Sequence, residues 1–338
     1  MTKFLFICKR NHSYGSEKGT FHGLVNSATF IAEFLNKRGI ESEVIQVTDG
    51  DDIDRVVQEK NPQVVVIEAL WATPAKMQDL VTMPEHRARL WIVRVHSKPA
   101  FLALEGKAMK WITSYPDEVV ICPNTRGLTA DLQDMGTDAM LLPNVYTPRG
   151  FDDYAYNKVQ SDSELNIACF GALRPLKNHL AQAIASIKFA NKVGLPMTFH
   201  INSTSGNSPN ISVLENLQAL FEKSKHNLSV HAWRRHPEFV KLVQTMDMGL
   251  QVSLSESFNL VAADFVTNRI PVLVSDEIDW LPSTVKVSAS SNSDQIAQMI
   301  EYVWRYYHPT LDRECRKALD SYNNHATAAW WKIAKRLT

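Results

Sequence analysis

The chain has 338 residues, of which 45 % are hydrophobic and 21 % charged, and its 36 basic side chains balance 36 acidic ones. This length suits two domains with a sizeable core, and this composition is typical of a soluble globular protein. Because the charges balance, no overall field directs the chain toward nucleic acid or a membrane surface.

The first apolar segment, Phe4–Cys8, is too short for a signal peptide and is typical of a first strand. No segment approaches the roughly 18 consecutive apolar residues of a membrane span, so we expect no membrane insertion and a cytoplasmic location. The four cysteines form no CxxC pair, which predicts buried thiols in a reducing compartment rather than a metal centre: Cys8, Cys122, Cys169 and Cys315.

The first half alternates short apolar segments with amphipathic ones, as in a parallel sheet covered by helices on both faces. Strands are expected at 4–8, 42–47, 63–67, 90–95, 118–122 and 139–142. Helices are expected at 23–38, 51–60, 77–80, 107–114 and 125–136.

The same alternation resumes after an interruption. The polar segment 147–164 contains Pro148 and Gly150 and is interpreted as a linker between a domain at 1–146 and a second domain at 165–308. Further strands are expected at 165–170, 197–202, 228–231, 248–254, 271–275 and 284–287, with helices at 179–193, 212–223, 237–244, 260–268 and 293–307. Pro309 then interrupts the pattern, and a last helix, 311–338, is expected to pack back on the first domain.

The predicted fold class is therefore α/β, with two Rossmann-like doubly wound domains facing each other across a cleft. In such domains ligands bind where the carboxyl ends of the parallel strands meet.

Two acids stand at such a strand end in the second domain. Glu256 follows the strand 248–254, a helix begins at about Leu260, and Asp264 lies two helical turns after Glu256. The amides at a helix start attract anions, while carboxylates accept hydrogen bonds from hydroxyls. A sugar with attached phosphates would suit this pattern. A solvent-facing acid is the alternative for Asp264, although its neighbours are apolar.

Two cations follow an earlier strand of the same domain. Arg174 and Lys177 come after Gly171 and before the helix 179–193. Arg offers a planar fork and Lys a point charge, which together can hold a diphosphate. The alternative is a loop whose charges are simply solvated.

Four ordered segments, 142–145, 167–177, 256–264 and 270–275, together resemble the GT-B glycosyltransferases, specifically the retaining enzymes of family 4. The resemblance covers about residues 142 to 282. The chain departs from the family pattern by having Ala172 for arginine, Asp264 for glutamate, and larger residues where glycine or another small residue is usual: Val145, Asn178, Asn259, Arg269 and Ile270.

The resemblance implies a retaining transferase that uses a nucleotide-activated sugar, with UDP the expected nucleotide and no obligatory cofactor or metal. It implies that Arg174 and Lys177 clamp the diphosphate, that Glu256 contacts the sugar and that Asp264 holds the ribose. The helix start, with Ser257, Phe258, Asn259 and Leu260, would offer amides to a phosphate. Trp233 and Arg234 could pack on the base or merely precede the next helix.

In the first domain, the resemblance implies that His96, at the end of the strand 90–95, lies near the reacting sugar. The alternative is a structural role, which is the commoner one for a lone histidine. The loop after the first strand, with His12, Tyr14 and Gly15, would approach donor and acceptor, or would be an ordinary polar loop.

Basic residues in this domain suggest an anionic acceptor. Lys9, Arg10 and Lys98 would line the acceptor side together with a basic segment between residues 86 and 110 that includes Arg87, Arg89 and Arg94. The segment 94–106 also resembles glycosyltransferase-like proteins of tailed bacteriophages, which glycosylate hydroxymethylated pyrimidines in their own DNA. Ordinary surface charge is the alternative. A lipid-linked or surface glycan as acceptor, or a binding protein without catalysis, also stays open.

Overall fold

The computed structural model describes residues 3–10, 23–147, 163–203 and 211–336. The contacts divide the described chain into two units. Unit 1 contains the described residues up to Thr147 together with those from Asn323 onward, and unit 2 contains those from Ser163 to Tyr322. Most of the predicted linker 147–164, and His12, Tyr14 and Gly15, lie outside the described residues.

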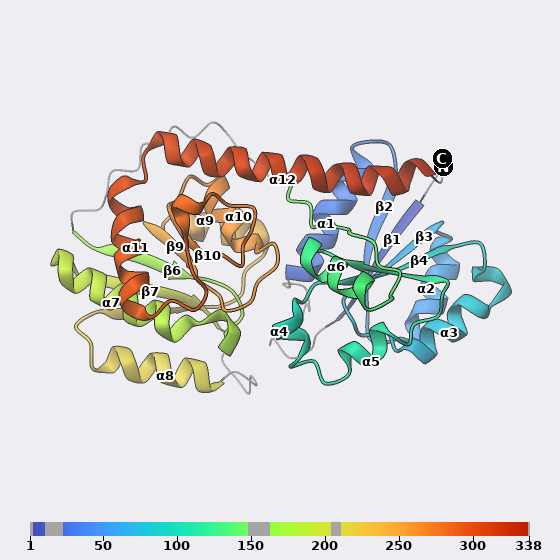
Figure 1. Cartoon of the computed structure of the whole chain (residues 1–338), viewed down its shortest axis with the longest axis horizontal. Helices are drawn as coiled ribbons and strands as arrows, with labels where there is room; N and C mark the ends of the chain where they lie inside the picture. The colour runs from blue at the N-terminus through green and yellow to red at the C-terminus, as the bar shows by residue number, and fades with distance from the viewer. Residues whose placement is uncertain (1–2, 11–22, 148–162, 204–210, 337–338) are drawn as a thin grey trace. The chain divides into compact units, whose positions relative to one another are not determined.

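Unit 1 is built on a five-stranded parallel sheet in the order β2-β1-β3-β4-β5 (Figure 1). Its strands are β1 (Lys3–Lys9), β2 (Glu41–Val47), β3 (Val64–Glu68), β4 (Leu90–Val95) and β5 (Val119–Pro123). Its helices are α1 (Gly23–Asn36), α2 (Asp52–Lys60), α3 (Pro74–Thr82), α4 (Pro99–Leu102), α5 (Ala108–Ile112) and α6 (Arg126–Asp134). The central strands are apolar along their length because both faces of the sheet are covered.

Unit 2 is built on a six-stranded parallel sheet in the order β11-β10-β9-β6-β7-β8. Its strands are β6 (Leu165–Cys169), β7 (Met197–Asn202), β8 (Asn227–His231), β9 (Met248–Gln251), β10 (Val272–Ser275) and β11 (Lys286–Val287). Helices α7 (His179–Val193), α8 (Ile211–Glu222) and α11 (Ser293–Tyr306) form one layer, and α9 (His236–Val243) and α10 (Leu260–Thr267) form another (Figure 1).

Helix α10 packs unusually close to β9 because the strand carries a glycine beneath it. A Cβ built on Gly249 would lie 2.4 Å from the ring of Phe265, a helix residue. Phe265 in turn stacks on Phe170, with ring centroids 6.2 Å apart. This contact fixes the height of α10 over the sheet, and with it the position of the loop that precedes the helix.

The last helix, α12 (Pro309–Arg336), is continuous in Figure 1, and Pro309 occupies its first position, where a proline costs no hydrogen bond. Within unit 2, its Tyr322 stacks on Phe258 at 4.7 Å. Within unit 1, the Asn323 side chain exchanges hydrogen bonds with both backbone groups of Tyr146, each at 3.0 Å. The carboxyl-terminal part of α12 thus packs on unit 1.

Most expected elements are present, with ends that differ by a few residues. The strand expected at 139–142 is wrong, since Ala139 makes only an isolated bridge to Ile121. The strand expected at 248–254 ends at Gln251, which leaves Val252 to Leu254 in the loop. Within the described part of the chain, none of the helices combines the length and the apolar character that a membrane crossing requires.

Candidate functional site

The order of the sheet in unit 2 marks one place for a ligand. Strand β6 lies between β7 and β9, so the direction in which the chain builds the sheet reverses there. The segments that follow β6 and β9 meet at this carboxyl edge, where Leu254 N donates to Leu176 O at 2.8 Å. The first segment carries Gly171, Arg174 and Lys177, and the second carries Glu256.

Lys177 and Glu256, predicted separately from the sequence, form an ion pair between the two segments. Both side chains are largely buried. The Asn259 side chain donates to Glu256 Oε2 at 3.0 Å, and Ser257 N donates to Glu256 Oε1 at 3.2 Å. The carboxylate is therefore held in place by a cation, an amide side chain and a backbone N–H.

Asn259 also starts helix α10. Its Oδ1 accepts from Ala262 N at 2.8 Å, which caps the helix, and its Nδ2 donates to Gln251 Oε1 at 2.8 Å. Gln251 is in turn fixed by donation to Phe170 O at 2.9 Å. A single side chain thus ties the helix start to the end of β9 and to the Glu256 carboxylate.

Three departures from the family pattern share one backbone property. Asn178, Asn259 and Arg269 have φ values of 56°, 61° and 58°, in the left-handed region. Glycine adopts this region without strain, and asparagine is the residue that tolerates it next best. Three of the five positions where the family usually has glycine or a small residue therefore keep the backbone conformation that glycine would favour.

The remaining residues of the helix start have different surroundings. Phe258 is buried between Trp280 and Tyr322, and its carbonyl accepts from Trp280 Nε1 at 2.7 Å. Its side chain thus anchors the loop that precedes α10 to Trp280 and Tyr322. Leu260 is partly exposed at the first position of α10. Gly171, with φ of 122°, needs the freedom of glycine, and its N–H donates to Asn202 Oδ1 at 3.3 Å.

Asp264, predicted to hold a ribose, is buried and accepts from His236 Nε2 at 2.6 Å. His236 opens α9 and follows the segment that contains Trp233 and Arg234. Trp233 is half-buried and Arg234 is exposed. The hydrogen bond therefore joins the segment predicted to meet the base to the helix predicted to meet the ribose.

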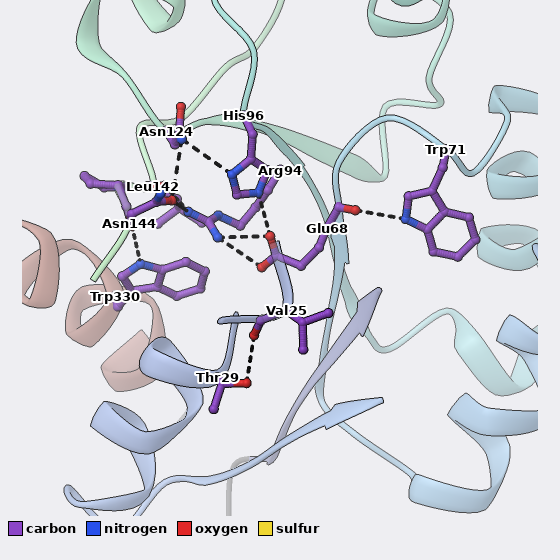
Figure 2. Close-up of polar contacts among 11 residues, drawn as sticks. Val25, Thr29, Glu68, Trp71, Arg94, His96, Asn124, Leu142, Asn144 and Trp330 are labelled. Atoms are coloured by element: carbon purple, nitrogen blue, oxygen red, sulfur yellow. Dashed lines mark hydrogen bonds and ion pairs between the residues drawn. The ribbon is translucent and has the colours of Figure 1, made fainter. Parts of the chain in front are cut away.

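In unit 1, polar side chains gather where β3 and β4 end (Figure 2). His96 Nε2 lies 2.6 Å from Glu68 Oε2, and Arg94 Nη1 donates to Glu68 Oε1 at 3.0 Å. Arg94 Nη2 also donates to Asn144 Oδ1 at 2.8 Å. Asn124 Nδ2 lies 3.5 Å from His96 Nδ1. The sequence identified His96 in this cluster, but not Glu68, Asn124 or Asn144.

The charges of this cluster control one another. Burial alone raises the pKa of Glu68, but Arg94 and His96 outweigh it, so the pKa of Glu68 lies below its ordinary value. Burial, together with the charge of Arg94, lowers the pKa of His96 against the opposing effect of Glu68. At neutral pH the cluster therefore contains a carboxylate, a guanidinium and a neutral imidazole.

The basic segment proposed for an acceptor is only partly a surface. Arg94 is fully buried and paired with Glu68, so its assignment to a basic surface is wrong. Arg89 precedes β4 and donates to Pro62 O and Asn61 Oδ1, at the opposite edge of the sheet from His96. Lys9, the last residue of β1, and Arg10 after it are exposed, and Lys98 is half-exposed before α4.

Among the described residues, no three His, Cys, Asp or Glu side chains lie together as ligands for a metal ion. The four cysteines are buried and unpaired as disulfides, and burial raises the pKa of Cys122 and Cys169 to about 12.

No protein-family model matches the sequence, and no curated protein matches it. Solved structures do match its fold. A trehalose-6-phosphate synthase, OtsA, aligns with a TM-score of 0.70 at 12 % identity over 99 % of both chains. A UDP-forming trehalose-phosphate synthase from Burkholderia xenovorans aligns with a TM-score of 0.65 at 10 % identity over 99 % of this chain and 98 % of that one. A glycosyltransferase from Rickettsia africae aligns with a TM-score of 0.62 at 11 % identity over 99 % and 97 %.

These similarities show the fold. The two parallel-sheet α/β units are those of the GT-B glycosyltransferases, which confirms the predicted fold class.

Proposed function

We propose that this protein is a retaining glycosyltransferase that moves a sugar from a nucleotide-sugar donor, with UDP as the nucleotide, to an acceptor hydroxyl. Residues 171–178 and 256–260 of unit 2 would bind the donor. Lys177 and Arg174 would hold the diphosphate, and the amides at the start of α10 would meet a phosphate. Glu256 would accept hydrogen bonds from the sugar hydroxyls.

The observation that carries this proposal is the arrangement of Lys177, Glu256 and Asn259 at the reversal point of the sheet. A largely buried ion pair gives little net stability, so selection for a ligand explains it better than selection for folding. A diphosphate that approaches would compete with Glu256 for the ammonium of Lys177. The carboxylate would then be free to accept from a sugar hydroxyl.

Two structures with the same fold support the donor. One is an E. coli protein bound with UDP-2-fluoro glucose, and it aligns with a TM-score of 0.70 at 11 % identity. The other is a trehalose-6-phosphate synthase whose structure gives insight into glycosyltransfer with retention, and it aligns with a TM-score of 0.63. By analogy, the acceptor would attack from the face that the diphosphate leaves, and a leaving-group oxygen would help remove its proton. No side-chain base is then required.

His96, at the end of β4, keeps its proposed role near the reacting sugar. Asp264 keeps its proposed ribose contact, for which it would have to exchange or share its hydrogen bond with His236. Trp233 and Arg234 would meet the base.

For the acceptor, the exposed charges of Lys9 and Arg10 and the half-exposed Lys98 suit an anion. Our candidate is a hydroxymethylated pyrimidine in DNA, which would place the protein with bacteriophage enzymes that act in the host cytoplasm. A sugar phosphate is the second candidate, since trehalose-phosphate synthases share the fold and a phosphate meets the same charges.

The test is UDP release from UDP-sugars in the presence of hydroxymethylated DNA, unmodified DNA, a hexose phosphate or a lipid-linked glycan. Release that requires one acceptor identifies it, and NMR of the product shows whether the anomeric configuration is retained. If UDP binds but no acceptor causes UDP release from a UDP-sugar, the protein is a nucleotide-sugar-binding protein and not an enzyme. A fold that no nucleotide stabilises would overturn the donor site itself.

A further inference from the structure

The cluster at the end of β3 and β4 surrounds His96, and its neighbours determine which ring nitrogen carries the hydrogen (Figure 2). Glu68, a carboxylate, can only accept, so the hydrogen of His96 must lie on Nε2, 2.6 Å from Glu68 Oε2. Nδ1 then carries a lone pair, at the limit of hydrogen-bond distance from Asn124 Nδ2 at 3.5 Å. A substrate hydroxyl can compete for that lone pair.

We infer that Glu68, Arg94 and Trp330 are positioning residues that hold His96 as a neutral imidazole with its Nδ1 available as a hydrogen-bond acceptor. The role of His96 beside a substrate rests on the proposed function, whereas its orientation and charge do not.

Arg94 makes the hydrogen bonds that hold the Glu68 carboxylate in place. Its guanidinium donates to both oxygens of Glu68, at 3.0 and 3.1 Å, and also to Leu142 O at 3.1 Å. Arg94 and Glu68 are direct neighbours across β4 and β3, and neither is exposed. Burying two charges is costly unless each is fully paired. Their presence at a strand end, beside a histidine, is explained if the pair sets the state of that histidine.

Hydrogen bonds also fix the backbone around Glu68. Ala69, the next residue, has φ of 73°, a strained value for a residue with a Cβ. Its N–H donates to Arg94 O at 3.1 Å, and Trp71 Nε1 donates to Glu68 O at 2.9 Å. The strained turn thus ends β3 with the Glu68 side chain directed at His96 and Arg94 rather than at solvent.

Helix α12 completes the arrangement. The Arg94 guanidinium lies over the ring of Trp330, 5.2 Å from its centroid, and Trp330 Nε1 donates to Pro143 O at 2.8 Å. Phe6 packs on the same indole at 5.7 Å. Trp330, near the end of the chain, therefore covers the buried guanidinium of Arg94, and it fixes the segment that provides Leu142 and Asn144.

The test is a pH titration of His96 in the full-length protein. The protein is labelled with ¹³C at histidine, and NMR monitors the titration. Among the residues that the structure describes, the charged groups that contact or act on His96 are Glu68 from β3 and Arg94 from β4. Cys8 of β1 lies beside both and is held as a thiol because burial raises its pKa. We expect Glu68→Gln to lower the midpoint of His96 and Arg94→Met to raise it, each by about one pH unit or more, since one removes a negative and the other a positive charge.

A matched control exists in the same unit. Asp54 accepts from His86 at 2.7 Å, so Asp54→Asn removes an acid from another histidine and should leave the titration of His96 unchanged. If Arg94→Met does not fold, the double variant Glu68→Gln/Arg94→Met, which leaves no uncompensated charge, replaces it. The double variant should titrate at a higher pH than Glu68→Gln alone, because it lacks the positive charge of Arg94.

Activity provides the second readout. Trp330→Phe keeps an aromatic ring near Arg94 but loses the hydrogen bond to Pro143 and part of the packing, and we expect a lower kcat together with an altered acid limb of the pH profile. UDP affinity should stay constant, because the proposed donor residues lie in unit 2. Identical His96 titrations in all variants would overturn the inference. A protein that transfers no sugar but shows opposite shifts would instead contradict the proposed function and keep the positioning role.

Discussion

Lys177 and Glu256, 79 residues apart in the sequence, form an ion pair where the segments after β6 and β9 meet. The cation and the acid belong to separate motifs, and the fold brings them into contact at the reversal point of the sheet. In this pair each charge neutralises the other. We propose that an anionic group would compete for Lys177 and a hydroxyl-bearing group for Glu256 when a donor binds.

Removal of either partner should abolish most transfer without unfolding the protein. We expect Lys177→Ala and Glu256→Ala to lower kcat/KM by about 10²–10³-fold, the range for loss of a group that stabilises a departing anion. Lys188→Ala is the matched control, since Lys188 pairs with exposed Asp294 in the same unit and should have normal activity. Normal turnover by either site variant would disprove its assigned role.

Asn259 and Asn178 should respond differently to glycine, although both have left-handed backbones. Asn259→Gly keeps the conformation and loses the cap of α10, which costs only a few tenths of a kcal/mol when glycine replaces asparagine. It also removes the donor to buried Gln251 Oε1 and to Glu256 Oε2, so activity should fall and stability should fall by about 1 kcal/mol or more. Asn178 makes no side-chain cap, so Asn178→Gly should be within about 0.5 kcal/mol of the parent. Denaturation and steady-state kinetics on the two variants measure this contrast. Equal changes in the two variants would mean that the hydrogen bonds of the Asn259 side chain contribute nothing.

Gly249→Ala should be strongly destabilising. The added methyl group would lie 2.4 Å from the Phe265 ring, which stacks on Phe170 and cannot move freely. Overpacking of this kind costs about 1–3 kcal/mol. The same variant should lower UDP affinity, because α10 would be pushed away from β9. Gly127→Ala, at a helix position with nothing within 4 Å, is the control, and a similar loss there would show that the cost is not steric.

His200 predicts how stability depends on pH. Burial and the neighbouring His231 lower the pKa of His200 to about 4. A histidine with a folded pKa below its unfolded value of about 6.5 takes up its proton in the unfolded state first. Its share of stability is therefore intact above about pH 6.5 and is lost as the pH falls toward 4, at up to about 1.4 kcal/mol per pH unit.

His200→Gln should flatten this acid loss. Urea denaturation at pH 7 and pH 5 would show a smaller difference in the variant than in the parent. An unchanged difference would mean that other groups, such as His179 with its pKa of about 3, account for the acid sensitivity.

The sequence predicted the fold through periodicity, and the proposed donor residues through loops that follow strands. Glu256, Lys177 and Asn259 lie in the loops or turns that follow β9 and β6, so their position at the sheet edge followed from the strand prediction. Their mutual contacts could not be predicted, because they depend on the order β9-β6 in the sheet, which alternation alone does not determine.

The buried cluster of unit 1 was missed for a related reason. Arg94 lies in an apolar strand, yet it was counted among surface charges because its partner is 26 residues away in the sequence. A signal was present, since Glu68 ends one buried strand and Arg94 is near the end of the next. The register that makes them neighbours became visible only in the sheet. No local sequence pattern indicated the contacts of Trp330 with Pro143 and Arg94.

The most direct test of the central claim is calorimetric titration of UDP into the parent protein and the variants Lys177→Ala and Lys188→Ala. We predict that UDP binds the parent and Lys188→Ala equally well, and that Lys177→Ala binds at least about 10-fold more weakly, the cost of one charge-assisted contact with phosphate. Equal affinity of all three proteins, or no binding to the parent, would contradict a donor site at Lys177 and Glu256.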